Sequence, residues 1–256
     1  GLIRKWLKAG ILEPLASQAE EPETGTPQGG IISPILANIY LHFVLDLWIE
    51  RRVKRRSRGK VIFMRYADDI IVGFSNKQDA TNYLGQLPGR LAKFKLRLAP
   101  DKTALVKFNR WESKSSGKFT FLGFDFYLAP SQRNPRNIVV KRKTNKKKFR
   151  ASLRRMKEWI MKARNWPLKM ILSSLRKKLS GYWNYYCVGA NSLMTSKYLR
   201  AVSGLMFKWL NRRSQRKSYT WGRFYKHWKG DWQIPYPQLV EKRKNRYAKQ
   251  SEMLLV

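Results

Sequence analysis

The chain has 256 residues, of which 54 are Lys or Arg and 16 are Asp or Glu, so its formal charge is +38. Hydrophobic residues make up 43% and aromatic residues 13%, which is typical of a globular protein and not of a disordered one. So strong a charge opposes folding by self-repulsion and predicts a polyanionic partner. One cysteine, Cys187, excludes a disulfide framework, and the two histidines cannot complete a structural zinc site.

A membrane surface is the rival polyanion. The richest apolar run, residues 35–49, is interrupted by Asn38, His42 and Asp46 and is too short to span a bilayer. The charge is uneven along the chain: residues 1–50 carry three basic and six acidic side chains, and the remainder carries 51 and 10. A polyanionic partner is therefore expected to contact the chain after residue 50.

The first predicted elements precede the basic region. Residues 2–11 predict a short amphipathic helix, and residues 20–30, rich in Pro, Gly and Thr, predict a loop or a hairpin. Ser33 as N-cap and Pro34 at the first helical position are typical of a helix start. Apolar residues at helical spacing continue to residue 47, so we expect a helix there.

Strand-like runs and one helix follow. Residues 61–66 and 69–74 are apolar runs around a tight turn and predict a β-hairpin. Residues 78–94 predict a helix that is interrupted near Pro88 and Gly89. Residues 102–108 and 119–127 are strand-like.

After an expected linker at residues 134–143, the pattern becomes helical. Apolar stripes predict three helices, which begin near Phe149, at Pro167 and after an Asn191-Ser192 cap. The expected fold class is α+β followed by a helical bundle. Leu179, Tyr182, Trp183 and Tyr186 fall on one helical face, so we expect most of them in the bundle core and not stacked on bases.

Two adjacent carboxylates, Asp68 and Asp69, stand at the predicted hairpin tip. Hard carboxylate oxygens suit Mg²⁺, which takes substrate phosphates as further ligands, and two such ions promote phosphoryl transfer. Taken alone, the pair is better explained as a polar turn, since Asp favours turns. The small side chain of Ala67 permits a close approach to a nucleic-acid end.

Three further segments each have a functional and an ordinary interpretation. Gln28, in a glycine-rich loop with Gly29 and Gly30, would contact bases or sugars, or the loop simply precedes a helix. Lys102 would lie near leaving phosphates as a cation or general acid, although a surface lysine is the commoner role. Leu122 and Gly123 would grip a strand end, or belong to a core strand.

Together the segments are far more specific than any one of them. Along the chain they read Thr26-Pro27-Gln28-Gly29-Gly30-Ile31-Ile32-Ser33-Pro34, Tyr66-Ala67-Asp68-Asp69, Lys102-Thr103, Phe121-Leu122-Gly123 and Leu175-Arg176-Lys177-Lys178-Leu179-Ser180-Gly181-Tyr182-Trp183. This order resembles the reverse transcriptases of group II introns, with the last segment similar to their maturase or thumb domain. The resemblance covers nearly the whole chain.

The resemblance implies the second half of a right-hand polymerase palm at residues 1–135, a helical thumb at 144–225 and a basic tail at 226–256. The implied activity is RNA-directed DNA synthesis in target-primed reverse transcription, together with binding of intron RNA to assist splicing. The implied cofactor is Mg²⁺, as two ions, and the implied partners are group II intron RNA, an RNA template with a DNA primer or target DNA, and a dNTP. No membrane partner is implied.

The resemblance also assigns the candidate site residues. Asp68 and Asp69 are the catalytic metal ligands. The remaining roles are nucleotide or template binding by Gln28, Gly29, Gly30, Tyr66, Ala67 and Lys102, primer grip by Leu122 and Gly123, and RNA binding by Arg51, Arg52, Arg55, Lys146, Lys147, Arg150, Arg154, Arg212 and Arg213.

Two departures from the family pattern shape the expectations. The third catalytic Asp, on an earlier palm strand, is expected before residue 1, so we expect this segment to be inactive alone. After Asp231 the chain is too short and too poor in Cys and His for an endonuclease domain, as in endonuclease-lacking relatives.

Alternatives to the polymerase interpretation stay open. One is a non-catalytic maturase, and another is a CRISPR- or defence-associated relative. The implied location is the bacterial cytoplasm, in ribonucleoprotein at the nucleoid, with an organelle as the alternative.

Overall fold

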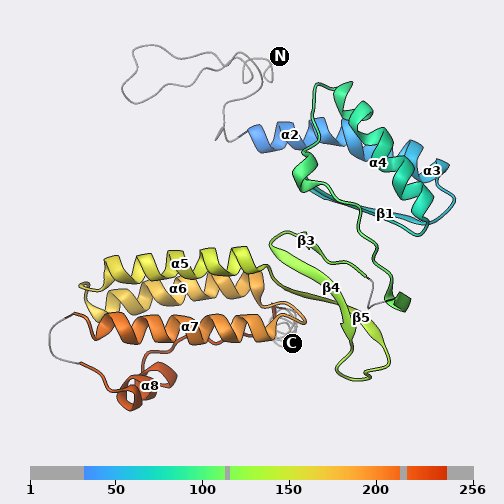
Figure 1. Ribbon diagram of the computed structural model, residues 1–256. Helices are drawn as coiled ribbons and strands as arrows, with labels where there is room; N and C mark the ends of the chain where they lie inside the picture. Colours follow the sequence, from blue (N-terminus) through green and yellow to red (C-terminus); the bar gives the residue numbers. More distant parts are fainter. Residues whose placement is uncertain (1–31, 113–115, 214–217, 241–256) are drawn as a thin grey trace, which may run out of the picture. The chain divides into compact units, whose positions relative to one another are not determined.

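The computed structural model describes residues 32–112, 116–213 and 218–240 (Figure 1). The chain divides into two compact units, residues 1–105 and 106–256, each with its own core. This division falls thirty residues before the expected end of the palm. It describes packing, and the assignment of polymerase domains stays a prediction.

The first unit is a helical layer on one face of a hairpin. A continuous helical run comprises α2 (Ser33–Leu41), the π-helical η1 (His42–Asp46) and η2 (Ile49–Val53), and α3 (Lys54–Arg56). The antiparallel strands β1 (Val61–Tyr66) and β2 (Asp69–Phe74) follow, then α4 (Lys77–Ala92) and the short 3₁₀ turn η3 (Pro100–Lys102).

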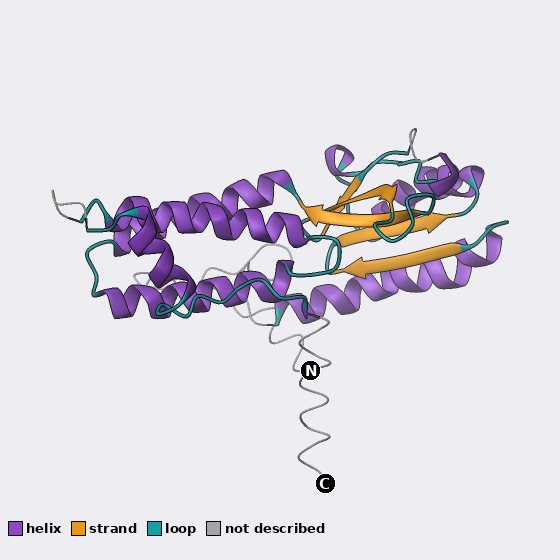
Figure 2. Cartoon of the chain, turned by 90° about the horizontal axis from the view of Figure 1, so that it is seen from below, coloured by secondary structure: helices purple, strands orange, loops and turns teal. Residues whose placement is uncertain are grey.

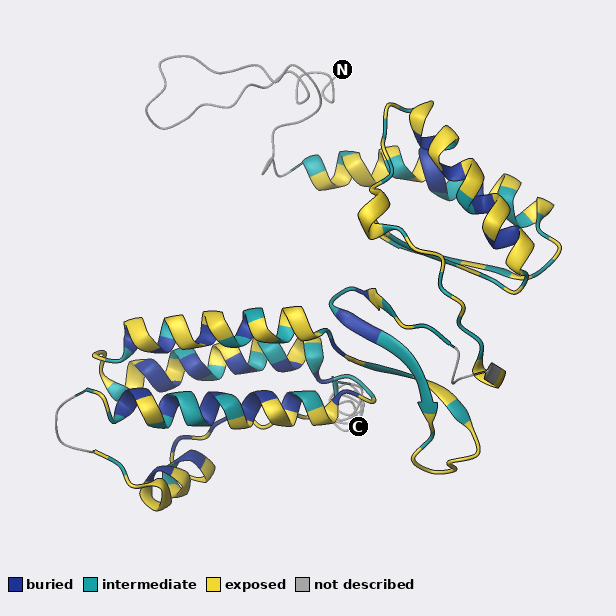
Figure 3. Cartoon of the chain, viewed as in Figure 1, coloured by how far each residue is buried: buried dark blue, intermediate teal, exposed yellow. Residues whose placement is uncertain are grey.

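Alternation along β1 explains why the hairpin folds onto helices. Phe63 points to a core of Val44, Leu45, Ile49, Tyr83, Leu87 and Leu91, whereas Ile62 and Met64 are exposed. A two-stranded hairpin is marginal by itself in water. Burial of one face under the helices therefore stabilises the hairpin, and Figure 3 shows the buried stripe that runs along α4.

Three predictions from the sequence are wrong in this unit. Helix α4 is not interrupted, because Pro88 lies on its exposed side, where water can satisfy the carbonyl that lacks a donor. Residues 102–108 form no strand, and only η3 is regular there. The first helix begins at Ser33 with Ile32 as its N-cap, one residue before the expected cap. The predictions for residues 2–11 and 20–30 lie outside the described residues.

The second unit joins a three-stranded sheet to a helical bundle (Figure 2). The sheet has the order β3 (Phe119–Phe121), β4 (Phe124–Pro130), β5 (Ile138–Thr144), all antiparallel. The 3₁₀ turn η4 (Arg110–Glu112) precedes it, and the helices are α5 (Lys146–Ala163), α6 (Leu168–Tyr186), α7 (Ser192–Leu210) and α8 (Trp221–Lys229).

The expected linker at residues 134–143 is wrong, since most of it forms β5. Lys141, Arg142 and Lys143 concealed the strand, but β5 lies at the sheet edge, where charged side chains are common. The strand expected at 119–127 is two strands around a turn at Leu122 and Gly123. Charged residues concealed β5, and an apolar residue in the turn made β3 and β4 read as one strand; both pairings join consecutive segments.

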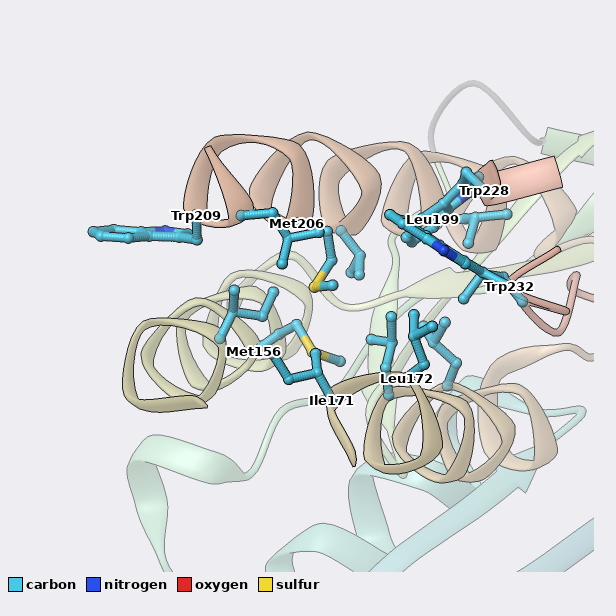
Figure 4. Packing of buried hydrophobic residues seen from close by; sticks show 14 of the residues in the cluster. Met156, Ile171, Leu172, Leu199, Met206, Trp209, Trp228 and Trp232 are labelled. Carbon is cyan, nitrogen blue, oxygen red and sulfur yellow. The ribbon is translucent and has the colours of Figure 1, made fainter. Parts of the chain in front are cut away.

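The bundle core combines aliphatic and aromatic side chains. Leu179 and Trp183 are buried as expected, whereas Tyr182 and Tyr186 are only partly buried. Figure 4 shows Met156, Ile171 and Met206 meeting from three helices, with Trp228 and Trp232 beside them. Residues 226–240, expected at the start of the tail, thus contribute to the core, and the Trp183 indole N–H donates to Pro235 O at 2.7 Å.

Asn191 ties the sheet to the bundle. Its amide oxygen accepts from the Thr144 backbone N–H at 2.8 Å, and its amide nitrogen donates to Thr144 Oγ1 at 2.9 Å and Tyr186 O at 2.8 Å. The residue is completely buried. The predicted side-chain cap on α7 is wrong, because these three bonds use the side chain to join β5 to the end of α6.

We expect Asn191→Ala to lower the free energy of unfolding by about 1–3 kcal/mol, because it leaves the buried Thr144 N–H without its acceptor and removes one of the two bonds to Tyr186 O, which keeps the Val188 N–H. Asn191→Asp, which keeps only the acceptor, should also destabilise the protein. Urea denaturation measures both, with the exposed α7 substitution Ser196→Ala as the control. A loss for Asn191→Ala no larger than that for Ser196→Ala would contradict this role.

Candidate active site

The carboxylate pair lies at the tip of the β1–β2 hairpin. Tyr66 pairs with Asp69, so Ala67 and Asp68 form a two-residue turn. Ala67 has a φ of +52°, a left-handed conformation that is uncommon for a residue with a side chain. Asp68 and Asp69 are exposed, and neither side chain has a bonding partner among the described residues. The turn therefore presents two free carboxylates to solvent.

Arg65 fixes the position of this tip. Its Nε and Nη2 donate to the two oxygens of Asp46, each at 2.7 Å, in a two-point ion pair. Its Nη1 donates to Asn38 Oδ1 at 2.8 Å and to Ala67 O at 3.1 Å. One guanidinium thus connects the turn backbone to α2 and η1, and its planar fork suits this geometry.

Both carboxylate oxygens of Asp46 are engaged by Arg65. Hydrogen bonding from Arg65 is the main cause that lowers the pKa of Asp46, and His42 Nδ1, 3.2 Å from Oδ2, adds to it. The same pair raises the pKa of Arg65. Since both carboxylate oxygens bind Arg65, Asp46 is not free to serve as a third metal ligand.

The donor chemistry of the tip fits part of a magnesium site. Asp68 and Asp69 supply hard oxygen ligands in the open, as Mg²⁺ requires when it keeps waters and binds substrate phosphates. Within residues 32–112, 116–213 and 218–240, no cluster of three or more His, Cys, Asp or Glu side chains occurs. Asp68 and Asp69 are therefore a candidate pair of ligands, and their role stays a prediction.

The other candidates near the tip fall in different places. Tyr66 is 66% exposed beside the turn. Lys102 is exposed in η3, and no described contact connects it with Asp68 or Asp69. Gln28, Gly29 and Gly30 lie outside the described residues. The structure therefore brings Tyr66 and Ala67 to the carboxylates, and the roles of the remaining residues stay predictions.

Leu122 and Gly123 form a second tight turn, in the other unit. Both have positive φ, +47° and +77°, as a two-residue type I′ hairpin turn requires. Leu122 O accepts from the Tyr185 hydroxyl at 2.8 Å, and Gly123 O accepts from the Asn145 N–H at 2.9 Å. The proposed primer grip is thus held against α5 and α6 by its own carbonyls.

The basic candidates form two exposed groups. Arg51, Arg52 and Arg55 are exposed near the end of the first helical run, and α5 exposes Lys146, Lys147, Arg150 and Arg154. Arg212 is exposed over the Trp209 ring, 5.2 Å from its centroid. Arg213 differs from the others, because its Nη2 donates to Trp166 O at 2.8 Å and it is only partly exposed.

Sequence reasoning missed Arg65 and Asn38. The available signal was the alternation along β1, which places Arg65 on the same face as Phe63, toward the helices. A charge on the buried face of a strand needs a partner. Asp46, one of six acidic residues before residue 51, was the natural candidate for that partner.

Comparison with known proteins is consistent with this arrangement. Residues 2–126 match the family described as reverse transcriptase (RNA-dependent DNA polymerase). The chain is 25% identical over 330 aligned positions to the group II intron-encoded protein LtrA of Lactococcus lactis subsp. cremoris, covering 98% of this chain and 54% of that protein. It therefore spans about half the length of this relative.

Two yeast proteins are similar over shorter stretches. The putative COX1/OXI3 intron 1 protein of Saccharomyces cerevisiae is 24% identical over 181 residues, covering 52% of this chain and 21% of that protein. An uncharacterized 91 kDa protein in the cob intron of Schizosaccharomyces pombe is 57% identical over 49 residues, covering 19% of this chain and 6% of that protein.

The Arg65–Asp46 pair generates a pH-dependent prediction. Asp46→Asn should lower the free energy of unfolding by about 1–3 kcal/mol at neutral pH, because it weakens charge-assisted hydrogen bonds. The pKa of Asp46 is lowered on folding, so its stabilisation is complete above the unfolded pKa of about 4 and is lost as the pH falls further. The difference between wild type and variant should therefore shrink below that pH.

Urea denaturation between pH 3 and 7 measures this difference. Glu50→Gln serves as the control, since the Glu50–Lys54 pair on the same helix is exposed and should contribute about 0.5 kcal/mol or less. A difference for Asp46→Asn that is constant across this pH range would show that the ion pair does not stabilise the tip.

Proposed function

We propose that this chain, which belongs to the group II intron reverse transcriptases and maturases, carries part of the active site of an RNA-directed DNA polymerase. Tyr66-Ala67-Asp68-Asp69 is the catalytic turn. The observation that carries the proposal is the exposed, unpartnered carboxylate pair on a turn that Arg65 holds in place. Two adjacent carboxylates on a turn of fixed position are suited to hold a divalent cation.

The proposed reaction joins a dNTP to a primer 3′-hydroxyl on an RNA template. Bound Mg²⁺, as two ions, would neutralise charge on the phosphates and activate the hydroxyl. Asp68 and Asp69 would hold these ions together with a carboxylate from outside the described residues. Without that carboxylate the segment is expected to be inactive, and Ala67 would leave room for the primer end.

Residues outside the turn would hold the nucleic acid. Leu122 and Gly123 are proposed as the primer grip, and their carbonyl bonds to Tyr185 and Asn145 would keep the turn rigid. Gln28, Gly29, Gly30 and Lys102 are proposed to contact the nucleotide or template. These assignments come from the family resemblance and not from contacts in the structure.

A second function, binding of intron RNA to assist splicing, is favoured by the basic face of α5. Lys146, Arg150 and Arg154 follow one another at four-residue spacing and are all exposed. Such a row suits phosphates along an RNA backbone. No described helix is long and apolar enough to cross a membrane. The proposed setting is a ribonucleoprotein in the bacterial cytoplasm.

The catalytic assignment predicts that substitution of the turn carboxylates abolishes DNA synthesis but not RNA binding. Asp68→Asn with Asp69→Asn in the intact protein should reduce DNA synthesis on an RNA template with an annealed primer to background, because metal ligation is lost. Binding of the same template should change less than about threefold, since no cation is removed. A primer-extension assay and a filter-binding assay measure the two quantities.

The matched control is Glu158→Gln, an exposed carboxylate on α5 with no proposed role. It changes the charge in the same direction and should leave synthesis intact. Synthesis at the wild-type rate by the double variant at the turn would rule out the catalytic assignment, whatever the RNA affinity.

The RNA-binding assignment predicts steep salt dependence. Affinity for structured RNA should fall by about 10³-fold or more between 50 and 200 mM salt if six or more phosphates are contacted. Lys146→Gln, Arg150→Gln and Arg154→Gln together should lower the slope of log affinity against log salt by about 3. The exposed α7 substitution Lys197→Gln is the control, and a slope unchanged by the triple substitution would exclude the α5 face.

A further inference from the structure

An open groove of about 720 Å³ runs between the first helical run and α4. One wall comes from residues 43–57 and the other from residues 79–93, and no hairpin residue lines it. Figure 1 shows α4 lying along this helical run. The groove is therefore a feature of the helical layer and is distinct from the carboxylate turn.

The first wall is built from π-helical backbone. η1 and η2 widen the helix there, and a π-helix leaves carbonyls outside the usual bonding ladder. Arg90 of α4 binds two carbonyls of η1, with Nε donating to Val44 O at 2.9 Å and Nη2 to Phe43 O at 3.1 Å. Arg90 thus fixes the two walls relative to each other, so the groove is preformed.

Positive charge dominates the lining. Arg51, Arg52, Arg56 and Lys93 line the groove, and none of their side chains has a described hydrogen-bond or ion-pair partner. The one acidic lining residue, Asp79, is buried and accepts from the Gly59 N–H at 3.0 Å. Four basic side chains without partners line this groove, and its acidic lining residue is already hydrogen-bonded, so the lining favours an anionic ligand.

The second wall, on α4, leaves part of its backbone uncovered by side chains. Gly85 and Gly89 lie one helical turn apart on α4, and a Cβ built on either would meet nothing within 4 Å. A ligand can therefore approach the α4 backbone closely at both positions. On the facing side, Phe43 is 58% exposed and offers an apolar surface beside the cations.

We propose that this groove binds a single strand of nucleic acid outside the active site. Its phosphates would lie against Arg51, Arg52, Arg56 and Lys93, and a base or sugar would pack on Phe43. A basic groove with an exposed aromatic ring is the combination that single-strand sites use. The inference rests on the proposed nucleic-acid function and assigns Arg56, Phe43 and Lys93 to it for the first time.

A photocrosslinking experiment on the intact protein tests the groove directly. Gln86 is an exposed lining residue, so Gln86→Cys labelled with benzophenone maleimide should crosslink to a fluorescent single-stranded RNA oligonucleotide. The one native thiol, Cys187, is buried and should not compete for the label. Thr81→Cys is the matched control, since Thr81 is exposed on α4 but outside the groove.

A second substitution should block the site. Adding Gly85→Glu and Gly89→Glu to Gln86→Cys fills the open space with negative charge, and replacing glycine also favours the helix. The crosslinked fraction should fall at least tenfold, whereas Thr81→Glu in the same background should leave it unchanged. Arg51→Gln with Arg52→Gln, both exposed, should also lower it, which covers a failure of the glutamate variant to fold.

The outcomes separate this proposal from the polymerase proposal. Crosslinking that persists in the glutamate and arginine variants would overturn it, as would crosslinking to duplex RNA of equal length that matches or exceeds that to the single strand. Asp68→Asn with Asp69→Asn should crosslink normally although DNA synthesis is lost. Loss of synthesis without loss of crosslinking thus tests the turn alone.

Discussion

The two-point ion pair between Arg65 and Asp46 is the constraint on which the candidate active site depends. A two-stranded hairpin is marginally stable, and two adjacent carboxylates at its tip repel each other. Arg65 counters the first effect, since it binds the Ala67 carbonyl of the turn and two side chains of the helical run. The position of the turn is therefore set by the helix and not by the hairpin alone.

In the second unit, the side-chain amides of two asparagines fix the orientation of the β3–β4 turn. Asn191 joins Thr144 at the end of β5 to Tyr186 at the end of α6. Asn145 caps α5 by accepting from the Lys147 and Lys148 N–H groups, and it donates to Asp125 at 2.7 Å. Because these bonds are short and directional, the β3–β4 turn is oriented by the bundle. Two asparagines thus connect the β3–β4 turn and β5 to the bundle.

Local pattern in the sequence was enough to predict the hairpin, the helices and the exposed carboxylate turn, because apolar periodicity and turn chemistry are short-range signals. It failed where charged residues concealed a strand and where the backbone departs from a regular helix. Strand β5 was hidden by Lys141 to Lys143, and the π-helical widening beside Arg90 has no sequence signature. Arg65 was visible as a charge on a buried face, yet only the structure pairs it with Asp46, nineteen positions away.

The few acidic side chains of this basic chain show what the fold needs and what it leaves free. Five of the ten described ones have internal partners: Asp46 binds Arg65, Asp79 the Gly59 N–H, Asp125 Thr120 and Asn145, Glu50 Lys54, and Asp231 His227. Asp101 and Glu158 are exposed without one within the described ranges. Asp68 and Asp69 have none among the described residues, although Arg65 lies two positions from the turn. With Arg65 committed to Asp46, Asn38 and the Ala67 carbonyl, the pair is left without a cation from the described part of the chain. Because Arg65 positions the turn and does not neutralise it, the negative charge of Asp68 and Asp69 is available to a ligand.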